Sequence, residues 1–293
     1  MDVSFLIVTK HRAADLKVTL DRLKTMIDLS LHEVLVLIDG CTETEALVAA
    51  YPWVQWTVLK ESVSASPARA ILYPKAKGTI LIGLDDDAHP LTVNFITTVQ
   101  SHFDQHPKVG IIAFQEVRGI FETDVEALTK AKTGTNYLTS DFIGCGFAIK
   151  KSVYEATNGF PKWMTIYGEE PAVALEVLDL GYDIIYSYDL QVNHRVDVAK
   201  RKQQGRNYFR FEHQLRNSLR FYLVYHPKPL KKIVKLLWHN FKKYALNDVG
   251  YFKSYTLVCF KTLFSLRRIL KYRQPVKPST LVKQQELQSI NYS

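Results

Sequence analysis

Residues 1–115 alternate short apolar segments with amphipathic ones, and this alternation restricts the fold more than any other feature of the sequence. The apolar segments are rich in β-branched residues, as buried strands are, and the segments between them carry apolar residues at helical spacing. The expected strands cover residues 3–8, 33–38, 54–59, 79–84 and 109–114, and the expected helices cover 13–26, 42–50, 66–75 and 91–103. This order is typical of βαβ units, so the sequence predicts an α/β fold with a mostly parallel sheet flanked by helices.

Charge divides the chain near residue 195. Residues 1–195 hold 17 Lys and Arg against 25 Asp and Glu, whereas residues 196–293 hold 21 against 4. A contrast of this size predicts two parts with different roles. We expect one folded domain over 1–195, a basic amphipathic helical extension over 196–273 with helices at 205–226, 228–245 and 249–273, and a flexible tail over 274–293.

Composition excludes several classes of protein. Apolar residues make up 47% of the chain and charged residues 23%, which is typical of a folded domain rather than a disordered or collagen-like chain. Cys41, Cys145 and Cys259 are few, distant and odd in number, so we expect free thiols in a reducing compartment. The first apolar run is too short for a signal peptide, and no apolar stretch reaches the length of a membrane span. We therefore expect a cytoplasmic protein.

Polar residues cluster where the expected strands end. Residues 9–12 (Thr-Lys-His-Arg) follow the first strand, Asp39 ends the second, and residues 85–87 (Asp-Asp-Asp) end the fourth. Ligands of parallel sheets bind at the carboxyl ends of the strands. Three adjacent carboxylates repel one another unless a cation or a ligand rich in donors compensates them, and Mg²⁺ and Mn²⁺ prefer oxygen ligands. A solvated acidic loop, or a helix cap before Pro90, is the alternative interpretation of this motif.

A second candidate site combines Glu169 and Glu170 with His194. The glutamates open an expected helix at 169–180, and the histidine follows an expected strand at 183–188. A carboxylate beside a substrate hydroxyl can act as a general base. Taken alone, however, the glutamates are better explained as favourable charges at a helix N-terminus without a chemical role, and a lone histidine is usually structural.

The order of these motifs resembles that of family 2 glycosyltransferases with the GT-A fold. The resemblance covers about residues 2–195, and the ordered series is more specific than any one motif. Its members are TKHR at 9–12, IDG at 38–40, Ala68-Arg69, LDDD at 84–87, GCGFAIKK at 144–151, YGEE at 167–170, GYDIIY at 181–186 and VNHR at 192–195. The resemblance implies inverting transfer of a hexose or deoxyhexose from a nucleotide diphosphate donor, with Mn²⁺ or Mg²⁺ as cofactor.

The resemblance also implies a role for each motif. A nucleotide-binding half would cover about 1–115 and an acceptor half about 116–195. Nucleotide contacts would come from Thr9, His11, Arg12, Asp39, Arg69, Asp85 and Asp86, metal ligands from Asp87, Asp85 and His194, and the catalytic base from Glu170. Glu169 stays a second candidate for the base, because a Glu-Glu pair replaces the family's usual Glu-Asp. The TKHR motif also departs from the usual Thr-Tyr-Asn-Arg, which leaves the contacts to the nucleotide base open.

Two other classes of protein compete with this interpretation. A sugar nucleotidyltransferase shares a related sheet and acidic metal ligands, but it usually has a glycine-rich loop after the first strand, and residues 9–12 contain no glycine. A nucleic-acid-binding protein would use the basic extension with its interleaved aromatics. The basic residues of that extension flank an apolar helical face and form no base-reading motif, so nucleic acid is the less favoured partner.

The extension has two compatible interpretations. The pattern of residues 228–245 predicts a helix with one apolar face beside several lysines. The residues of that face are Leu230, Ile233, Val234, Leu237, Trp238 and Phe241. That face can pack on the catalytic domain, or residues 205–273 can hold the protein on the inner face of the cell membrane through anionic lipid. A saccharide or lipid-linked saccharide acceptor, as in bacterial surface polysaccharide or glycolipid assembly, would explain such an attachment.

Overall fold

The computed structural model describes residues 1–198 and 205–290. Within them, nine strands form one sheet: β1 (Val3–Thr9), β2 (His32–Asp39), β3 (Gln55–Leu59), β4 (Ile80–Asp85), β5 (Ala88–Pro90), β6 (Val109–Arg118), β7 (Tyr137–Thr139), β8 (Gly146–Lys150) and β9 (Asp183–His194). The strand order is β3-β2-β1-β4-β8-β6-β9-β5, and β7 pairs with β9.

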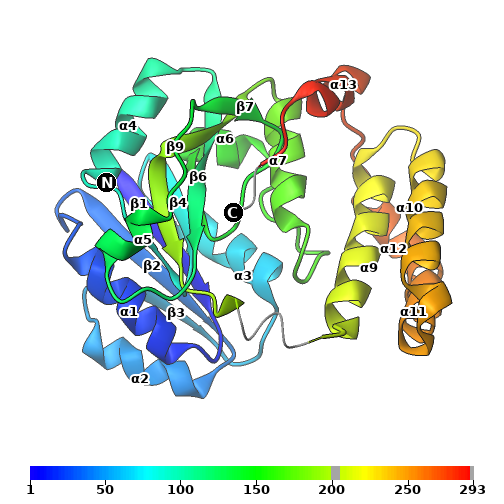
Figure 1. Cartoon of the computed structure of the whole chain (residues 1–293), viewed down its shortest axis with the longest axis horizontal. Coiled ribbons are helices and arrows are strands. Elements are labelled where there is room, and N and C mark those ends of the chain that lie inside the picture. The colour runs from blue at the N-terminus through cyan, green and yellow to red at the C-terminus, as the bar shows by residue number, and fades with distance from the viewer. Residues whose placement is uncertain (199–204, 291–293) are drawn as a thin grey trace.

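The pairing directions confirm the predicted α/β fold with a mostly parallel sheet. Strands β1, β2, β3, β4, β6 and β9 run in one direction, and β5, β7 and β8 run in the other. The flanking helices are α1 (Ala13–Lys24), α2 (Thr42–Ala50), α3 (Ala65–Leu72), α4 (Phe95–Gln105), α5 (Asp124–Thr129), α6 (Lys151–Ala156) and α7 (Glu169–Asp179) (Figure 1). A single 3₁₀ turn, η1 (Tyr73–Lys75), follows α3.

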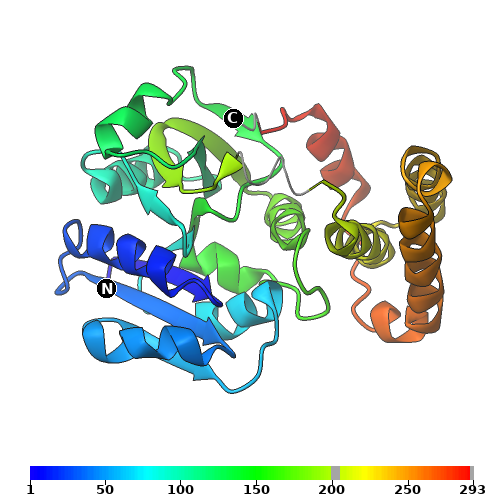
Figure 2. The ribbon, with the colours of Figure 1, turned by 60° about the horizontal axis from the view of Figure 1, so that its bottom comes forward.

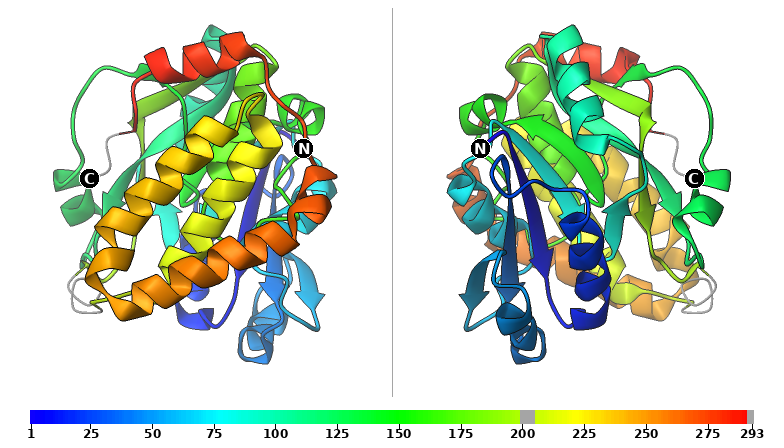
Figure 3. Two further views of the ribbon diagram at one scale, coloured as in Figure 1. Left: turned by 90° about the vertical axis from the view of Figure 1, so that its right-hand side faces the viewer. Right: turned by 90° about the vertical axis from the view of Figure 1, so that its left-hand side faces the viewer.

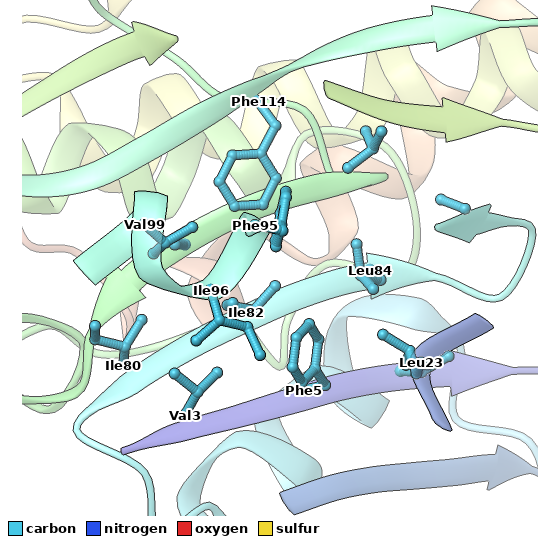
Figure 4. Packing of buried hydrophobic residues seen from close by; sticks show 14 of the residues in the cluster. Val3, Phe5, Leu23, Ile80, Ile82, Leu84, Phe95, Ile96, Val99 and Phe114 are labelled. Carbon is cyan, nitrogen blue, oxygen red and sulfur yellow. The ribbon is translucent and has the colours of Figure 1, made fainter. Parts of the chain in front are cut away.

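Two apolar cores lie on opposite faces of the sheet, because alternate strand residues point to opposite sides. Phe5 and Ile7 face the core covered by α1 and α4, whereas Leu6 between them faces the core covered by α3 and α7. In the first core, the rings of Phe95 and Phe114 meet edge to face with centroids 5.0 Å apart (Figure 4). Because both faces of the sheet are buried, the register of its strands is fixed. The position of the edge at which the strands end is fixed as well.

The basic extension forms a helical layer beside the sheet. It contains α9 (Tyr208–Tyr225), α10 (Leu230–Lys243), the 3₁₀ turn η2 (Ala245–Asn247), α11 (Val249–Phe264), α12 (Leu266–Leu270) and α13 (Pro278–Glu286). Helix α9 lies between α7 and the outer helices α10 and α11 in both views (Figures 1 and 2). Phe211 and Leu215 of α9 pack towards α11, and Val224 and Tyr225 pack with Leu175 of α7. The tyrosine hydroxyl also donates a 2.6 Å hydrogen bond to Glu176.

The last segment differs from the predicted flexible tail. Residues 278–286 form α13, which packs against α7. The backbone N–H of Lys277 and the hydroxyl of Thr280 both donate to the Asp179 carboxylate, at 2.8 and 2.6 Å. Ile290 beyond the helix is only 6% exposed. Specific contacts with α7, rather than an apolar pattern of its own, order this segment; residues 291–293 lie outside the described part of the chain.

Other predicted elements differ mainly at their ends. The expected strand at 141–149 begins only at Gly146, and the expected strand at 183–188 continues to His194, because β9 stays paired with β6 beyond an irregularity near Phe114. Strands β5 and β7 and helix α5 were not predicted, since each is too short to show a period. The three cysteines are free thiols, as expected. Among the described residues, no helix has both the length and the apolar character that crossing a bilayer requires.

Candidate active site

The predicted motifs meet at one edge of the sheet. Strands β1 and β4 are parallel with Val8 beside Asp85, so residues 9–12 and 85–87 leave the sheet side by side. His194 ends β9, where it pairs with Ala88 just after the aspartate run. The register of the strands thus brings together residues that are more than 180 positions apart in the sequence.

Asp85, Asp87 and His194 form a compact group of potential metal ligands. One ligand atom from each lies within 4.8 Å of the others, and Oδ1 of Asp87 lies 3.3 Å from Nε2 of the histidine. The opposite ring nitrogen, Nδ1, contacts the buried carboxylate of Glu116 on β6. A carboxylate behind a histidine fixes its orientation, which is a common arrangement around metal-binding histidines.

The pKa values of Asp87 and His194 are shifted in opposite directions. Burial alone would raise the pKa of the Asp87 carboxyl, but His194 and Arg12 outweigh burial and hold that pKa below its usual range. Burial would lower the pKa of the His194 imidazole, yet its bonds to Asp87, Cys145 and Glu116 raise that pKa to about 12. Both groups are therefore charged at neutral pH.

These residues fit a divalent cation. Oδ1 of Asp87 is buried and, within the described part of the chain, accepts no hydrogen bond of normal geometry beyond its ion-pair contact with His194 at 3.3 Å. Carboxylate oxygens and an imidazole nitrogen suit Mn²⁺, and an oxygen-rich set suits Mg²⁺. A cation here would replace the proton that His194 otherwise carries towards Asp87.

The middle aspartate has a different position from its neighbours. Asp86 is buried, accepts a 2.8 Å hydrogen bond from the Thr9 hydroxyl and forms a 2.8 Å ion pair with Arg12. Burial raises the pKa of Asp86 to about 7. The Arg12 guanidinium also reaches Asp87 at 2.5 Å. The structure therefore places Asp86 and Thr9 behind the site rather than on its surface, and it places Arg12 as the link between the first and fourth strands.

Two other predicted nucleotide contacts lie away from this group. The Asp39 carboxylate is buried and accepts hydrogen bonds from Ser62 and from the backbone of Val63 and Ser64, so it holds the loop that precedes α3. The His11 side chain is 62% exposed, and its Nδ1 lies 3.2 Å from the Cys41 sulfur. Neither residue lines the pocket that contains the glutamate pair.

Arg69 connects the aspartates to the glutamates. Its buried guanidinium lies 2.9 Å from Asp85 and 2.8 Å from Glu170, with Glu169 at 3.7 Å. Burial opposes the charge of Arg69, but the surrounding carboxylates outweigh burial and raise its pKa. The Arg69 guanidinium therefore lies between the aspartate run and the glutamate pair and forms ion pairs with both.

The two glutamates differ in accessibility. Helix α7 starts after Gly168, whose φ of +106° favours glycine, and its first turn carries both side chains. The Glu169 side chain is 4% exposed and that of Glu170 is 18% exposed. Burial, reinforced by the neighbouring Glu170, raises the pKa of Glu169 to about 8. Glu170 is thus the better placed of the two to meet a substrate.

A pocket of about 390 Å³ joins these groups. Five of the predicted site residues line it: Arg69, Asp85, Glu169, Glu170 and His194. Its floor approaches the backbone of Gly144, where an added Cβ would lie 2.2 Å from a carboxylate oxygen of Glu170. A side chain at this position would therefore displace the Glu170 carboxylate from where it lies.

Comparison with solved structures relates this arrangement to known proteins. TarS of S. aureus in complex with UDP-GlcNAc superposes with a TM-score of 0.62 at 13% identity, over 93% of this chain and 84% of that one. The mannosyltransferase PcManGT of Pyrobaculum calidifontis, in complex with GDP-Man and Mn²⁺, gives 0.58 at 16% identity, over 97% and 85%. GalNAc-T7 with UDP, GalNAc and Mn²⁺ gives 0.61 at 16% identity; 80% of this chain matches only 49% of that protein.

The chain has a GT-A-like glycosyltransferase fold. Comparison with models of known protein families and with curated protein sequences finds no match. At these identities the similarity establishes the fold, and the roles of individual residues rest on the site itself.

Sequence reasoning missed several residues of the site. Glu116 lies two residues beyond the strand expected at 109–114, and its only signal in the sequence is a single acidic residue after that apolar run. Asp141, whose pKa burial raises to about 7, also lines the pocket. Tyr167, Arg210 and Gln214 complete one wall. The last two come from α9, and no local pattern indicates that this helix reaches the site.

Proposed function

We propose that this protein is an inverting glycosyltransferase that moves a hexose or deoxyhexose from a nucleotide diphosphate donor to a hydroxyl acceptor. The observation that carries the proposal is one pocket lined by Asp85 and His194, which with the buried Asp87 form a group of potential metal ligands, and by the accessible carboxylate of Glu170. A GT-A-like fold provides the context for both.

Glu170 would act as the general base. As the acceptor oxygen attacks the anomeric carbon, the bond between that carbon and the nucleoside diphosphate breaks, and the hydroxyl proton moves to the Glu170 carboxylate. A single displacement of this kind inverts the anomeric configuration. Arg69, which forms an ion pair with Glu170, can turn towards the phosphates of the donor and free the carboxylate.

Asp85, Asp87 and His194 would hold Mn²⁺ or Mg²⁺. A bound cation supplies charge neutralisation at the diphosphate leaving group. Glu116 orients the histidine, and Arg12 together with Thr9 fixes the aspartate run from behind. These contacts position the ligands before any substrate arrives.

The acceptor is proposed to be a saccharide or lipid-linked saccharide of surface polysaccharide or glycolipid assembly. The outer helices α10 and α11 support contact with a membrane, since Leu230, Val234 and Trp238 are more than half exposed beside five exposed lysines of α10. Exposed aromatic and aliphatic side chains among lysines bind anionic lipid surfaces. The proposed place of the protein is the inner face of the cell membrane.

A screen of nucleotide sugars with Mn²⁺ or Mg²⁺ tests the function. UDP, GDP and dTDP sugars are incubated with the full-length protein, and release of the nucleoside diphosphate and thermal stabilisation are both measured. We expect at least one donor to stabilise the protein and to be turned over only with the metal. Formation of a nucleotide sugar from a nucleoside triphosphate and a sugar phosphate would instead support a nucleotidyltransferase.

A further inference from the structure

The pocket beside Glu170 continues onto the helical extension. Tyr167, Arg210 and Gln214 line one side of the pocket, and the same three residues border a second hollow of about 740 Å³. The second hollow extends along α9 to Tyr244 and Tyr251. The two hollows adjoin at these three side chains, and together they are called the groove, which extends from the glutamate pair to the aromatic side chains of the extension.

The second hollow has the chemistry of a saccharide site. The described side chains that line it are aromatic, amide or guanidinium groups: Tyr167, Asn207, Arg210, Phe211, Gln214, Tyr244 and Tyr251. Aromatic faces stack on the C–H faces of sugar rings, and amides hydrogen-bond to hydroxyl groups. No leucine, isoleucine, valine or methionine is among these lining residues, so the hollow offers little to an acyl or prenyl chain.

Polar groups in this hollow are available to a ligand. Within the described part of the chain, the side-chain amide of Gln214 and the hydroxyl of Tyr244 form no hydrogen bond to protein. Gln214 is exposed and Tyr244 is half-buried against Phe211, with ring centroids 5.1 Å apart. A rigid aromatic beside a free amide is a preorganised surface, which lowers the entropy cost of binding.

Helix α9 also builds the segment that leads into α7. Tyr167 has a φ of +70°, which a residue with a side chain adopts only when its surroundings hold it there. The buried Asn217 donates to the carbonyls of Ile166 and Tyr167 at 2.8 and 2.9 Å, and Arg210 lies 5.2 Å over the Tyr167 ring. The extension therefore shapes the groove immediately before the catalytic glutamates.

We propose that the helical extension supplies the acceptor site: a saccharide lies in this groove with its reactive hydroxyl at Glu170 and a further sugar ring against Tyr244 and Tyr251. This inference rests on the proposed glycosyltransferase function. It assigns acceptor selection to residues 205–251, outside the part of the chain that carries the nucleotide and metal groups.

The test measures saccharide binding without turnover. Saturation-transfer NMR is recorded on the full-length protein with p-nitrophenyl glycosides and disaccharides of glucose, galactose, mannose and N-acetylglucosamine as probes. We expect at least one probe to receive saturation, and Gln214→Ala and Tyr244→Ala to weaken its binding about tenfold. Tyr272→Ala, a tyrosine outside the groove, is the control and should bind as the unmodified chain does.

The outcomes separate this inference from the proposed function. Gln214 is exposed, so Gln214→Ala should keep the fold even if Tyr244→Ala does not, and its Tm should match that of the unmodified chain. If Gln214→Ala leaves the binding of every probe unaffected, the acceptor-site inference is wrong. The same holds if the unmodified chain binds no probe while it still hydrolyses a donor; the proposed function stands in both cases. Saccharide binding without any donor turnover would contradict the proposed function and leave a saccharide groove in place.

Discussion

Glu169 and Glu170 are adjacent in the chain, yet their surroundings assign them different properties. Glu169 is buried with one carboxylate oxygen lacking a hydrogen-bond partner among the described residues, and Glu170 reaches the pocket and the Arg69 guanidinium. The sequence left the identity of the base open, because a Glu-Glu pair stands where the resembling family has Glu-Asp. Accessibility favours Glu170.

Replacing either glutamate with glutamine, which has an NH₂ group in place of one carboxylate oxygen, tests which of the two is the base. Glu170→Gln should lower turnover by about two orders of magnitude or more while donor binding stays near normal, because proton removal is needed only during the reaction. Glu169→Gln serves as the matched variant and should retain most of the turnover. Initial rates and donor thermal shifts are measured for both; the reverse pattern would assign the base to Glu169.

At the scale of elements, the loop before β8 shapes the same site. Gly144 approaches Glu170 and Arg69 so closely that a methyl group cannot fit without moving them. Gly144→Ala should therefore reduce kcat strongly with little change in Tm. Gly181→Ala is the control: its φ of +93° makes alanine strained, but nothing lies within 4 Å, so stability should fall and kcat should not. Equal kcat losses would argue against a specific role for the contact.

Helix α13 provides a second test at this scale. Ile290 is buried against the sheet domain, so Ile290→Ala should lower the free energy of unfolding by about 2–3 kcal/mol. Val282→Ala, at an exposed position of α13, should change it by less than about 0.5 kcal/mol. Chemical denaturation measures both. If the Ile290 variant is as stable as the Val282 variant, the prediction of a flexible tail over residues 274–293 would be supported instead.

The elements also show what the sequence could and could not predict. The strand ends at Thr9, Asp39 and Asp85 were predicted because apolar runs and the polar residues after them are local signals. Helix α13 was not predicted, since its order depends on Asp179, a residue about 100 positions earlier. Glu116 was missed for the same reason: its function depends on His194, which only the pairing of β6 and β9 brings beside it.

At the scale of the whole molecule, α10 separates the two interpretations of the basic extension. Ile233 and Leu237 pack in the core around Phe211, whereas Leu230, Val234 and Trp238 remain 75%, 65% and 57% exposed. Helices α10 and α11 lie at the end of the molecule opposite β1, β2 and β3 (Figure 1), and they face the viewer in Figure 3, left. The predicted apolar face therefore serves packing on one side and leaves a surface on the other.

Vesicle co-sedimentation tests that surface. The full-length protein should bind vesicles that contain phosphatidylserine at low salt and release them as salt rises, because the lysines are screened. Replacement of Leu230, Val234 and Trp238 by serine should reduce binding about tenfold or more without loss of fold. Val93→Ser, at an apolar residue 79% exposed on the sheet domain, is the matched control. Equal binding by all variants, or no preference for anionic lipid, would leave packing as the role of α10.

The central claim is that a divalent cation bound by Asp85, Asp87 and His194 supports sugar transfer from a nucleotide diphosphate donor. The most direct measurement is release of nucleoside diphosphate by the full-length protein with and without Mn²⁺. It is compared with release by Asp87→Ala and by Asp104→Ala, an exposed aspartate of α4 that belongs neither to the ligand group nor to the pocket lining. We predict release that EDTA abolishes and Mn²⁺ restores, lost in the folded Asp87 variant and retained in the Asp104 variant. Full release in EDTA, or by the Asp87 variant, would contradict the account.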